Sequence, residues 1–394
     1  MSWLVLNTGS SSLKFGLFDK GANTPLVQGS VNWREGQSAE LSVQVGDGPK
    51  SPRSCDVSDP GGAATLAIEA VLAASDRAEI RAVGHRIVHG GTKFQESVQI
   101  TPEVEADIQQ LIELAPLHNP PALAGLASAQ KTLPDLPQVA VFDTSFFGDL
   151  PRQSVTLPIP QSWTKDWGIR RFGFHGISHS YCAGRAAEIL GRDPSTLRLV
   201  ICHLGNGCSA SAIRGGKPVD TSMSFTPLDG LMMGTRSGSV DPGVLLYLLK
   251  ENKIDRDGLD DALNHQSGLL GVSGVSGDYR KVEAAADGGN DQARLALEIY
   301  VARIRSTIGG MAATLGGVDA LVFAAGVGEN SATLRSAACS GLDFMGIKLD
   351  AARNEAKPVD ADIAATDSPT RVLVVHTQEE LMIAREVRRL IGSV

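Results

Sequence analysis

Short apolar runs that end in turns rich in glycine, serine or asparagine recur along the chain. Residues 3–6 form one run, residues 7–12 (NTGSSS) form the turn, and residues 13–18 form a second run. The same order returns across residues 199–213, around the turn GNG. This pattern predicts pairs of β-strands joined as hairpins. Because one hairpin falls in each half of the chain, we expect two similar halves whose turns face a shared cleft.

Apolar residues spaced three and four positions apart predict two helices. The first should begin after Thr101-Pro102, an N-cap followed by proline in the first turn. Its apolar positions are Val104, Ile108, Leu111 and Leu114. The second is longer, and its glycine pairs at 309–310 and 316–317 favour a packed internal helix over a coiled coil. Its apolar positions are Leu297, Val301, Ile304, Ile308, Met311 and Leu315.

The last part of the chain continues this alternation of strands and helices. Residues 319–324 predict a buried strand that feeds a turn at 326–330 and then a helix at 331–339. Residues 371–375 predict a late strand, and residues 378–391 a final helix. Strands that alternate with helices indicate an α/β fold.

Composition narrows the class of protein. The chain has 394 residues, enough for two or three domains that need no disulfide or metal for stability. We expect a boundary between halves near the proline-rich segment 150–160. The net charge of −8 argues against a nucleic-acid partner, which would need clustered Lys and Arg, but not against a nucleotide.

The cysteines and the apolar stretches indicate in which cellular compartment the protein is expected. The five cysteines are odd in number and form no CxxC pair, so we expect free thiols in a reducing compartment. No basic region precedes the apolar run at 3–6, which argues against a signal peptide. No apolar stretch reaches the roughly 18 residues that a membrane span needs. The expected location is the cytoplasm.

No standard nucleotide loop is present. The chain lacks both GxxxxGK[ST] and a GxGxxG that follows a strand, so an ATP-binding protein would need another phosphate cradle. Residues 7–14, 203–207 and 326–330 each offer backbone N–H groups in a turn after a strand. The third also precedes a predicted helix, whose N-terminus favours anions. Each one alone is also an ordinary glycine turn, but together they favour phosphate binding.

Two arginines and one aspartate are candidates for chemistry. Arg86 lies in VGHRIVHGG and Arg236 in MMGTRSG, among apolar residues and glycines. Such an arginine is either part of a buried structural salt bridge or a planar donor for carboxylate or phosphoryl oxygens. Asp143 follows the apolar run 139–142, at a strand end where α/β proteins place their sites. A turn or helix-cap aspartate is an equal alternative.

The histidines do not favour a zinc site. His85/His89 and His175/His179 have the spacing of metal ligands on a helix but lack the glutamate of HExxH. Three histidines fit better as neutral hydrogen-bond donors beside transferring oxygens, with a structural role as the alternative for each. These are His118, His175 and His203. No GxSxG hydrolase motif occurs.

A series of motifs resembles acetate kinase. They are NTGSSSLK (7–14), GHRIVHGG (84–91), RFGFHG (171–176), HLGNG (203–207), DTSM to RSG (220–238), SGLLG (267–271), DYR (278–280) and GEN (328–330). They stand in the family's order and, with Glu379, span almost the whole chain. The resemblance implies an α/β fold of two duplicated actin-like (ribonuclease H-like) domains with an active-site cleft between them. Residues 1–147 with 377–394 would form the acid and metal side, and residues 148–376 the nucleotide side.

The resemblance also implies a reaction and the residues that perform it. The reaction is reversible, Mg²⁺-dependent, in-line transfer of the ATP γ-phosphoryl group to acetate, giving acetyl phosphate and ADP, with Mn²⁺ as a substitute metal and a homodimer as the assembly. The implied metal ligands are Asn7 and Glu379. The implied catalytic residues are Asp143, His175 and Arg236. The implied acid-binding residues are Arg86 and a methyl pocket of Val88, Leu117, Phe174 and Pro227. The implied nucleotide contacts are Lys14, His203, Leu204, Gly205, Asn206, Gly207, Asp278, Tyr279, Arg280, Gly326, Val327, Gly328, Glu329 and Asn330.

Three positions depart from the family's usual pattern. Ala325 stands where the family usually has glycine, which puts nucleotide affinity or base preference in question. Cys208 replaces an alanine and Ser239 an aspartate, and both changes are expected to be tolerated.

The mechanism and the rival functions follow from the same residues. A carboxylate substrate is already ionised at neutral pH and needs no general base. Asp143 is therefore interpreted as an organiser of Arg86 or of metal-bound water. The alternatives are a kinase for propionate or another short-chain acid, an actin-like or chaperone-like ATPase switch, and a binding module without catalysis.

Overall fold

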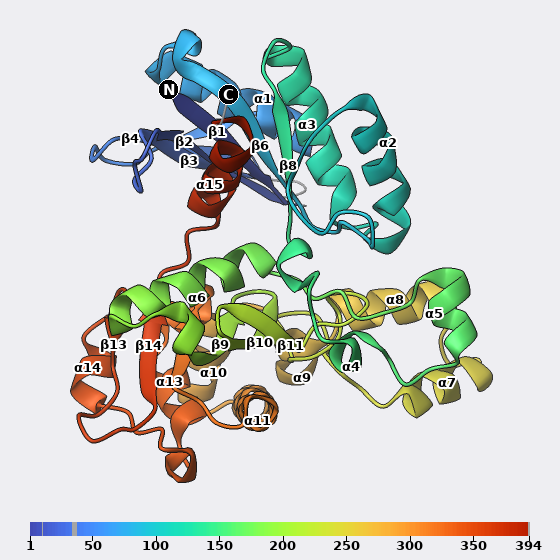
Figure 1. Ribbon diagram of the computed structural model, residues 1–394. Helices are drawn as coiled ribbons and strands as arrows, with labels where there is room; N and C mark the ends of the chain where they lie inside the picture. The colour runs from blue at the N-terminus through green and yellow to red at the C-terminus, as the bar shows by residue number, and fades with distance from the viewer. Residues whose placement is uncertain (10, 34–37, 393–394) are drawn as a thin grey trace. The chain divides into compact units, whose positions relative to one another are not determined.

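The chain forms an α/β structure, seen here in a computed structural model (Figure 1). The structure describes residues 1–9, 11–33 and 38–392, so Ser10 of the expected 7–14 segment and the last two residues of the expected first domain lie outside it. The chain divides into two compact units. Unit 1 comprises Met1–Gly148 and Gln378–Val394, and unit 2 comprises Asp149–Thr377. The chain passes between the units after Gly148 and after Thr377, one residue beyond the boundaries expected after residues 147 and 376.

The sheet of unit 1 has the strand order β5-β4-β3-β2-β1-β6-β8-β7. Its strands are β1 (Ser2–Thr8), β2 (Ser12–Asp19), β3 (Val27–Asn32), β4 (Ala39–Val45), β5 (Ser51–Cys55), β6 (Ile80–Ile87), β7 (Val98–Gln99) and β8 (Gln138–Phe142). β1 to β5 form an antiparallel meander, whereas β6 and β8 run parallel to β1. The hairpin expected at residues 3–18 is confirmed as β1–β2.

Helices cover both faces of this sheet. They are α1 (Pro60–Ala74), α2 (Pro102–Gln110), α3 (Asn119–Thr132) and α15 (Glu379–Ile391), with short 3₁₀ turns at Arg77–Glu79, Leu111–Leu114 and Ser145–Phe147. Val83 of β6 joins the buried cluster formed with α1. The next residue, Gly84, faces Ile383 and Val387 of α15 so closely that a Cβ would clash with them. Because successive strand residues point to opposite faces, α15 lies on the face opposite α1.

Two predicted helices of unit 1 are confirmed. The side chain of Thr101 caps α2 by accepting a hydrogen bond from Val104 N, and Pro102 opens the helix as expected. The α-helix ends at Gln110, and Leu111–Leu114 continue as a 3₁₀ turn. The final helix α15 begins at Glu379, with Gln378 at its N-cap position.

The sheet of unit 2 has the order β11-β10-β9-β12-β14-β13. Its strands are β9 (Arg198–Leu204), β10 (Cys208–Arg214), β11 (Lys217–Thr221), β12 (Ala320–Ala324), β13 (Ala361–Asp362) and β14 (Arg371–Val375). The central order β11-β10-β9-β12-β14 matches β3-β2-β1-β6-β8 of unit 1, with the same antiparallel and parallel neighbours. The expected second hairpin and the duplication of the two halves are therefore confirmed.

The helices of unit 2 are α4 (Arg152–Val155), α5 (Gln161–Trp167), α6 (Gly176–Leu190), α7 (Pro242–Lys250), α8 (Arg256–His265), α9 (Gly268–Ser273), α10 (Tyr279–Asp287), α11 (Asp291–Leu315), α12 (Ala325–Asn330), α13 (Ala332–Cys339) and α14 (Ala351–Glu355), with 3₁₀ turns at Pro194–Thr196 and Asp343–Met345. Among them, α6, α11 and α12 contact strands of the sheet. The prediction of a turn at 326–330 is wrong, because this segment winds into the short helix α12. Ser331 then caps α13, which confirms the helix expected after it.

The long helix α11 is confirmed, but its buried stripe differs at the start from the prediction. Ile304, Ile308, Met311 and Leu315 are buried as expected, whereas Leu297 and Val301 are only half-buried. The buried line there runs through Ala296 and Tyr300 instead, in steps of four residues. Both lines lead to Ile304, by a step of four residues from Tyr300 or of three from Val301, so apolar spacing alone does not choose between them.

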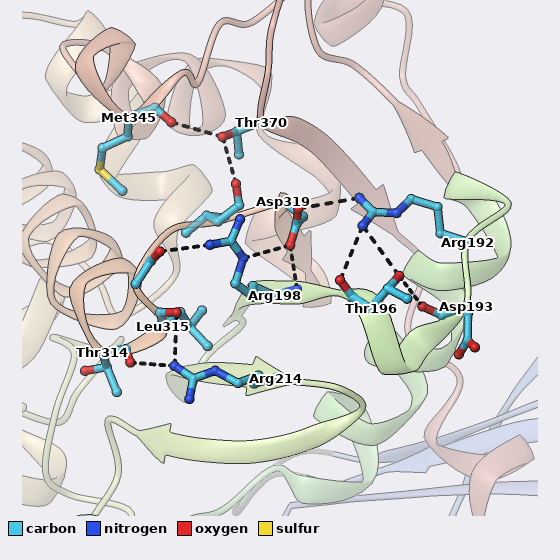
Figure 2. Close-up of polar contacts among 12 residues, drawn as sticks. Arg192, Asp193, Thr196, Arg198, Arg214, Thr314, Leu315, Asp319, Met345 and Thr370 are labelled. Atoms are coloured by element: carbon cyan, nitrogen blue, oxygen red, sulfur yellow. Dashed lines mark hydrogen bonds and ion pairs between the residues drawn. The ribbon is translucent and has the colours of Figure 1, made fainter.

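Asp319 ties the start of β9 to the start of β12 (Figure 2). Its Oδ2 accepts from the backbone N of Arg198 at 2.8 Å and from Arg198 Nε at 3.0 Å. Arg192 Nη1 lies 3.5 Å from Oδ1, and Arg198 Nη1 also donates to the carbonyl of Gly316 at the end of α11. Burial acts to raise the pKa of Asp319, but the hydrogen bonds from Arg198 lower it below its ordinary value. This cluster fixes the alignment of β9 with β12.

The cysteines and the apolar helices complete the description of the fold. All five cysteines carry free thiols, and four of them are buried. Within the described residues, no helix has both the length and the apolar character needed to cross a membrane.

Candidate active site

In unit 1, the carboxyl ends of parallel strands bring Asn7, Arg86 and Asp143 together. β1, β6 and β8 are neighbours, and Asp143 follows directly on β8. The Arg86 guanidinium donates to a single oxygen of Asp143, Oδ2, from Nε at 3.1 Å and from Nη2 at 2.5 Å. The side chain of Asp143 is only 1% exposed and that of Arg86 18%. Arg86 therefore fits both alternatives offered by the sequence. It forms a salt bridge with Asp143, and the exposed part of its guanidinium can still donate to a substrate oxygen.

Asn7 extends this network to the start of α15. Arg86 Nη1 donates to Asn7 Oδ1 at 3.2 Å. Asn7 Nδ2 in turn donates to Glu379 Oε2 at 3.1 Å and to Glu380 Oε1 at 2.9 Å. Burial acts to lower the pKa of Arg86, but Asp143, Glu379 and Glu380 raise it above its ordinary value. The guanidinium is therefore permanently charged and fixed in orientation.

The second oxygen of Asp143 is available to a ligand. Asp143 Oδ1 is buried and makes no hydrogen bond to any residue in the described part of the chain. Burial raises the pKa of this carboxyl, and Arg86 opposes that rise. Because buried polar atoms almost always have a partner, this oxygen marks a position where a substrate or a water could bind.

The acidic end of the network fits a magnesium ion. Asn7, Glu379 and Glu380 offer amide and carboxylate oxygens, the ligands that Mg²⁺ prefers. No group of three or more His, Cys, Asp or Glu is arranged as a metal cage among the described residues. Mg²⁺ keeps several waters, so two or three protein ligands are sufficient. Glu380 was not among the sequence candidates, although an acidic pair at a predicted helix start could have suggested it.

The remaining candidates of unit 1 lie around this network. Lys14 is exposed and stands directly opposite Asn7 in the β1–β2 hairpin. Val88 is buried, just beyond the end of β6, whereas Leu117 is 42% exposed. His118 occupies the N-cap position of α3. The burial of Val88 fits an apolar pocket, and the exposure of Leu117 within this unit gives that prediction no support.

In unit 2, the glycine turn after β9 brings His175 and Arg236 together. A Cβ built on Gly207 would lie 3.3 Å from His175 Cε1 and 3.7 Å from Arg236 Nη1. Glycine leaves this space open, so both side chains reach one point beside the turn. Arg236 Nη1 donates to the carbonyl of Pro227 at 3.4 Å, and burial lowers the pKa of Arg236. An arginine remains charged despite such a shift, so the turn faces a cation.

His175 is held in an unusual backbone conformation. It is the N-cap of α6 and has a φ of 58°, in the left-handed region. Its Nδ1 lies 2.9 Å from Ser209 Oγ, and its ring stacks on that of His203 with centroids 4.3 Å apart. His179 Nε2 lies 2.8 Å from the same serine hydroxyl. Strained, over-determined residues of this kind are concentrated at functional sites.

The other two segments expected to contact a nucleotide lie beside the same turn, residues 203–207. Gly234 N donates to the carbonyl of Asn206 at 3.0 Å, and a Cβ on Gly234 would lie 2.7 Å from the carbonyl of Gly277. Gly277 precedes the expected DYR segment. On the other side, a Cβ on Gly205 would lie 3.8 Å from the Cβ of Ala325. α12, the segment at 277–280 and the turn at 203–207 are thus neighbours.

The DYR residues differ in exposure. Asp278 caps α10 by accepting from Arg280 N at 3.0 Å, and Arg280 folds back to pair with the same carboxylate. Tyr279 is buried, whereas the Arg280 side chain is 86% exposed. Phe174 is buried and Pro227 half-buried, both in unit 2. The expected methyl pocket combines these two with Val88 and Leu117 of unit 1, and it stays a prediction.

Comparison with known proteins decides the family. The sequence profile of the acetokinase family matches residues 2–385. The chain belongs to the acetokinase family. Its relatives within the family include proteins named acetate kinase from Gloeobacter violaceus, 50% identical over 404 aligned residues and 98% of each chain, and from Nostoc punctiforme, 50% identical over the full length of both chains.

Solved structures agree with this membership in the acetokinase family. The crystal structure of Porphyromonas gingivalis acetate kinase matches with a TM-score of 0.88 and 43% identity, covering 99% of each chain. A propionate kinase from Francisella tularensis matches with a TM-score of 0.92 and 37% identity, covering 99% of this chain and 100% of that one.

One departure from the acetokinase pattern has a clear physical basis. Ala325 has a φ of 65°, in the left-handed region where glycine is favoured. Its N donates to the Glu329 carboxylate at 2.8 Å. The family's usual glycine therefore suits the backbone, and this chain places a strained methyl group beside the 203–207 turn. The other two departures have partners, because Cys208 Sγ contacts Tyr300 OH at 3.0 Å and Ser239 Oγ donates to Asp229 at 2.6 Å.

Two serines that position histidines were missing from the sequence candidates. Ser209 contacts both His175 and His179, and Ser178 Oγ lies 2.8 Å from His203 Nδ1. No local motif marks them, because each contact joins β9 or β10 to α6 through the tertiary fold. Only their closeness in the sequence to the acetokinase motifs RFGFHG and HLGNG could have pointed to these two serines.

Proposed function

We propose that this protein is an acetate kinase, which transfers the γ-phosphoryl group of ATP to acetate and runs in reverse from acetyl phosphate and ADP. Membership of the acetokinase family supports the reaction class. The observation that carries the proposal is the network Asp143–Arg86–Asn7–Glu379, which combines a fixed cation with a set of oxygen ligands. A fixed cation suits the acid, and the oxygens suit Mg²⁺.

Arg86 binds the carboxylate of the acid in this proposal. Its guanidinium is oriented by Asp143 and Asn7 from two sides, so little entropy is lost when the substrate binds. Acetate is ionised at neutral pH, because the pKa of a carboxyl group lies about three units lower. The acid can therefore attack phosphorus without a general base, and Asp143 acts by positioning Arg86.

Arg236 and His175 stabilise the phosphoryl group in transfer. The transition state of phosphoryl transfer is loose, with negative charge spread over its equatorial oxygens. The Arg236 guanidinium and the His175 ring approach one point beside Gly207 and can meet those oxygens as donors. The turn at 203–207, the DYR segment and α12 hold the nucleotide around that point.

The metal would be held by Asn7 and Glu379, with Glu380 and Asp143 beside them. Mg²⁺, or Mn²⁺ in its place, would supply positive charge that neutralises the phosphoryl oxygens of the nucleotide. Asn7 carries the amide oxygen of this set, and its Nδ2 keeps the two glutamates close to one another.

The proposal is tested by the dependence of ATP turnover on a carboxylate. The purified protein should release ADP from Mg-ATP only when acetate is added, and turnover should stop when the metal is chelated. An ATPase of the actin or chaperone type would release ADP without acetate. That result would replace the kinase assignment.

Propionate is the second candidate acid. The 37% identity to a propionate kinase over nearly the whole chain favours testing it. One methylene changes pocket binding by about 1–3 kcal/mol. We expect kcat/KM for acetate to exceed that for propionate by about tenfold, and the reverse order would reassign the substrate.

We further propose that the protein is a cytoplasmic homodimer that associates through α7. This helix, PGVLLYLLK, has no buried residue, and Leu246 and Tyr247 are 56% and 54% exposed. Leu245 and Leu248 are half-buried, and the other apolar side chains of the helix are exposed. An exposed apolar face of this kind is typical of an interface between subunits, and a second copy of the chain is the partner that a homodimer supplies. Leu246→Glu should halve the mass measured by light scattering, while Leu295→Glu, at an exposed leucine of α11, should not.

A further inference from the structure

The Glu329 carboxylate connects two segments of unit 2. Its Oε1 accepts from Ala325 N at 2.8 Å and from Thr377 N at 3.1 Å. Its Oε2 lies 2.6 Å from His376 Nδ1. The side chain is only 13% exposed. One carboxylate thus ties the first turn of α12 to the last two residues of unit 2, through hydrogen bonds strengthened by its charge.

The backbone that carries Glu329 is itself fixed from the other side. Arg335 is the largest fully buried side chain in the described part of the chain. Its Nη1 donates to the carbonyls of Gly328 and Glu329 at 2.9 and 2.8 Å, and its Nε donates to Asn354 at 2.7 Å. The backbone at Glu329 is therefore held rigidly, so the Glu329 carboxylate can fix the positions of the residues that it contacts.

The segment His376–Thr377 also reaches the second nucleotide element. Thr377 Oγ1 lies 2.9 Å from Ser178 Oγ, and that hydroxyl lies 2.8 Å from His203 Nδ1. His203 is the residue that stacks on His175. His376–Thr377 is therefore bonded both to α12, through Glu329, and to His203 near the end of β9, through Ser178.

The same segment leads directly into the metal network of unit 1. Thr377 is followed by Gln378 and then by Glu379, the first residue of α15. The Glu379 carboxylate accepts from Asn7 at 3.1 Å. Only two peptide bonds separate Thr377 from Glu379, the proposed metal ligand, so a displacement of Thr377 would also move Glu379.

We infer that Glu329 is a positioning residue on which both nucleotide binding at α12 and metal binding at Glu379 depend. The inference rests on the proposed function, since it takes α12 as a nucleotide element and Glu379 as a ligand. Loss of the carboxylate should therefore weaken nucleotide and metal binding together, without affecting the acid bound by Arg86.

The test compares Glu329→Ala with Glu329→Gln in the full chain. Glutamine keeps an oxygen that can accept from Ala325 N and Thr377 N, whereas alanine leaves both without that acceptor. Glu298→Ala is the matched control, because Glu298 is an exposed glutamate on α11 of the same unit. ADP affinity is measured by calorimetry without metal, Mn²⁺ affinity by electron paramagnetic resonance without nucleotide, and KM for acetate by steady-state kinetics.

For Glu329→Ala we expect both ADP and Mn²⁺ to bind about fivefold more weakly, the effect of losing one typical hydrogen bond. KM for acetate should change less than twofold, and Glu329→Gln should keep both affinities close to those of the wild type. If only ADP binds more weakly, Glu329 positions α12 alone and the inference is wrong. Unchanged affinities, or a fall in Tm with unchanged affinities, overturn it as well.

Failure of the proposed function would look different. A wild-type protein that forms no acetyl phosphate would remove the kinase assignment whatever the variants do. A wild-type protein that forms acetyl phosphate, beside a Glu329→Ala variant with normal affinities for ADP and Mn²⁺, would overturn this inference alone.

Discussion

The Arg86 guanidinium uses two nitrogens to bind one oxygen of Asp143, and the other oxygen of that carboxylate is buried without a hydrogen bond to any described residue. An aspartate engaged in this way holds the arginine in place. The arrangement favours a positioning role for Asp143 over proton transfer, because the substrate acid already carries its negative charge.

Replacement of Asp143 by asparagine should therefore act on acid binding. The introduced amide would keep one acceptor for Arg86 but lose the charge, so Asp143→Asn should raise KM for acetate about tenfold, equivalent to about 1.4 kcal/mol. Steady-state kinetics between pH 6 and 9 measure this. Asp143→Ala, which leaves the partly buried Arg86 without its carboxylate partner, should in addition destabilise the protein by about 3 kcal/mol in urea unfolding, the lower end of the range for buried ion pairs. A loss of kcat alone in Asp143→Asn, with KM unchanged, would instead indicate a proton acceptor.

Removal of Arg86 should change the KM values of the two substrates by different amounts. Arg86→Ala should raise KM for acetate far more than KM for ATP, because the guanidinium contacts the acid in this account. Arg86→Lys should be intermediate, since an ammonium keeps the charge but loses the planar donor geometry. Kinetics with each substrate varied in turn give the comparison. Equal increases in both KM values would assign Arg86 a structural role.

Removal of Arg236 should act on kcat. Arg236→Ala should lower kcat by about 10³-fold, the lower end of what an arginine contributes to stabilising a phosphoryl group. The control is Arg214→Ala, because Arg214 donates to the carbonyls of Thr314 and Leu315 at the end of α11 (Figure 2). Initial rates at saturating substrates measure both. A decrease below roughly tenfold for Arg236→Ala would remove this residue from the transfer centre.

The strained methyl group of Ala325 gives a prediction about stability. Left-handed backbone costs a non-glycine residue about 1–2 kcal/mol, while glycine costs about 0.4–1 kcal/mol through the entropy of the unfolded chain. Ala325→Gly should therefore leave the free energy of unfolding unchanged or raise it by up to about 1.6 kcal/mol. Ala338→Gly, at a buried position of α13, should lower it by about 1 kcal/mol. Equal destabilisation in urea unfolding would contradict the left-handed assignment.

Asp319 should make stability depend on pH. Its pKa is lower in the folded protein than in the unfolded chain, because Arg198 holds the charged form. This contribution is present above the unfolded pKa of about 4 and is lost as the pH falls through the folded value. Asp319→Asn should cost about 1.5 kcal/mol in urea unfolding at pH 7, and the difference from wild type should shrink as the pH falls from 5 towards 3. A difference independent of pH would show that the charge is irrelevant.

Local patterns were sufficient for much of the fold. Both hairpins, the strand before Asp143 and the helix after Thr101 follow from apolar spacing and capping residues, which act over a few positions. The duplication followed from the repeated hairpins and is visible in the matching strand orders. The segment 326–330 was missed as a helix because two of its five residues are glycines, which disfavour helix, and tertiary contacts from Arg335 hold it instead.

The candidate site was only partly accessible from the sequence. Arg86 and Asp143 could be proposed because each follows or ends a buried strand. The contact of Asn7 with Glu380, 373 positions apart, depends on how α15 packs against β1 and β6. Glu329 could be recognised as part of a motif, but its bonds to His376 and Thr377 exist only in the folded unit.

The most direct test of the account is to trap the product of the forward reaction. The protein is incubated with Mg-ATP, acetate and hydroxylamine, and the hydroxamate formed from an acyl phosphate is measured by its ferric complex. An acetate kinase should form hydroxamate in amounts equal to the ADP released, with about 10³-fold slower formation in Arg236→Ala. ADP release without hydroxamate would show that the phosphoryl group is not transferred to acetate.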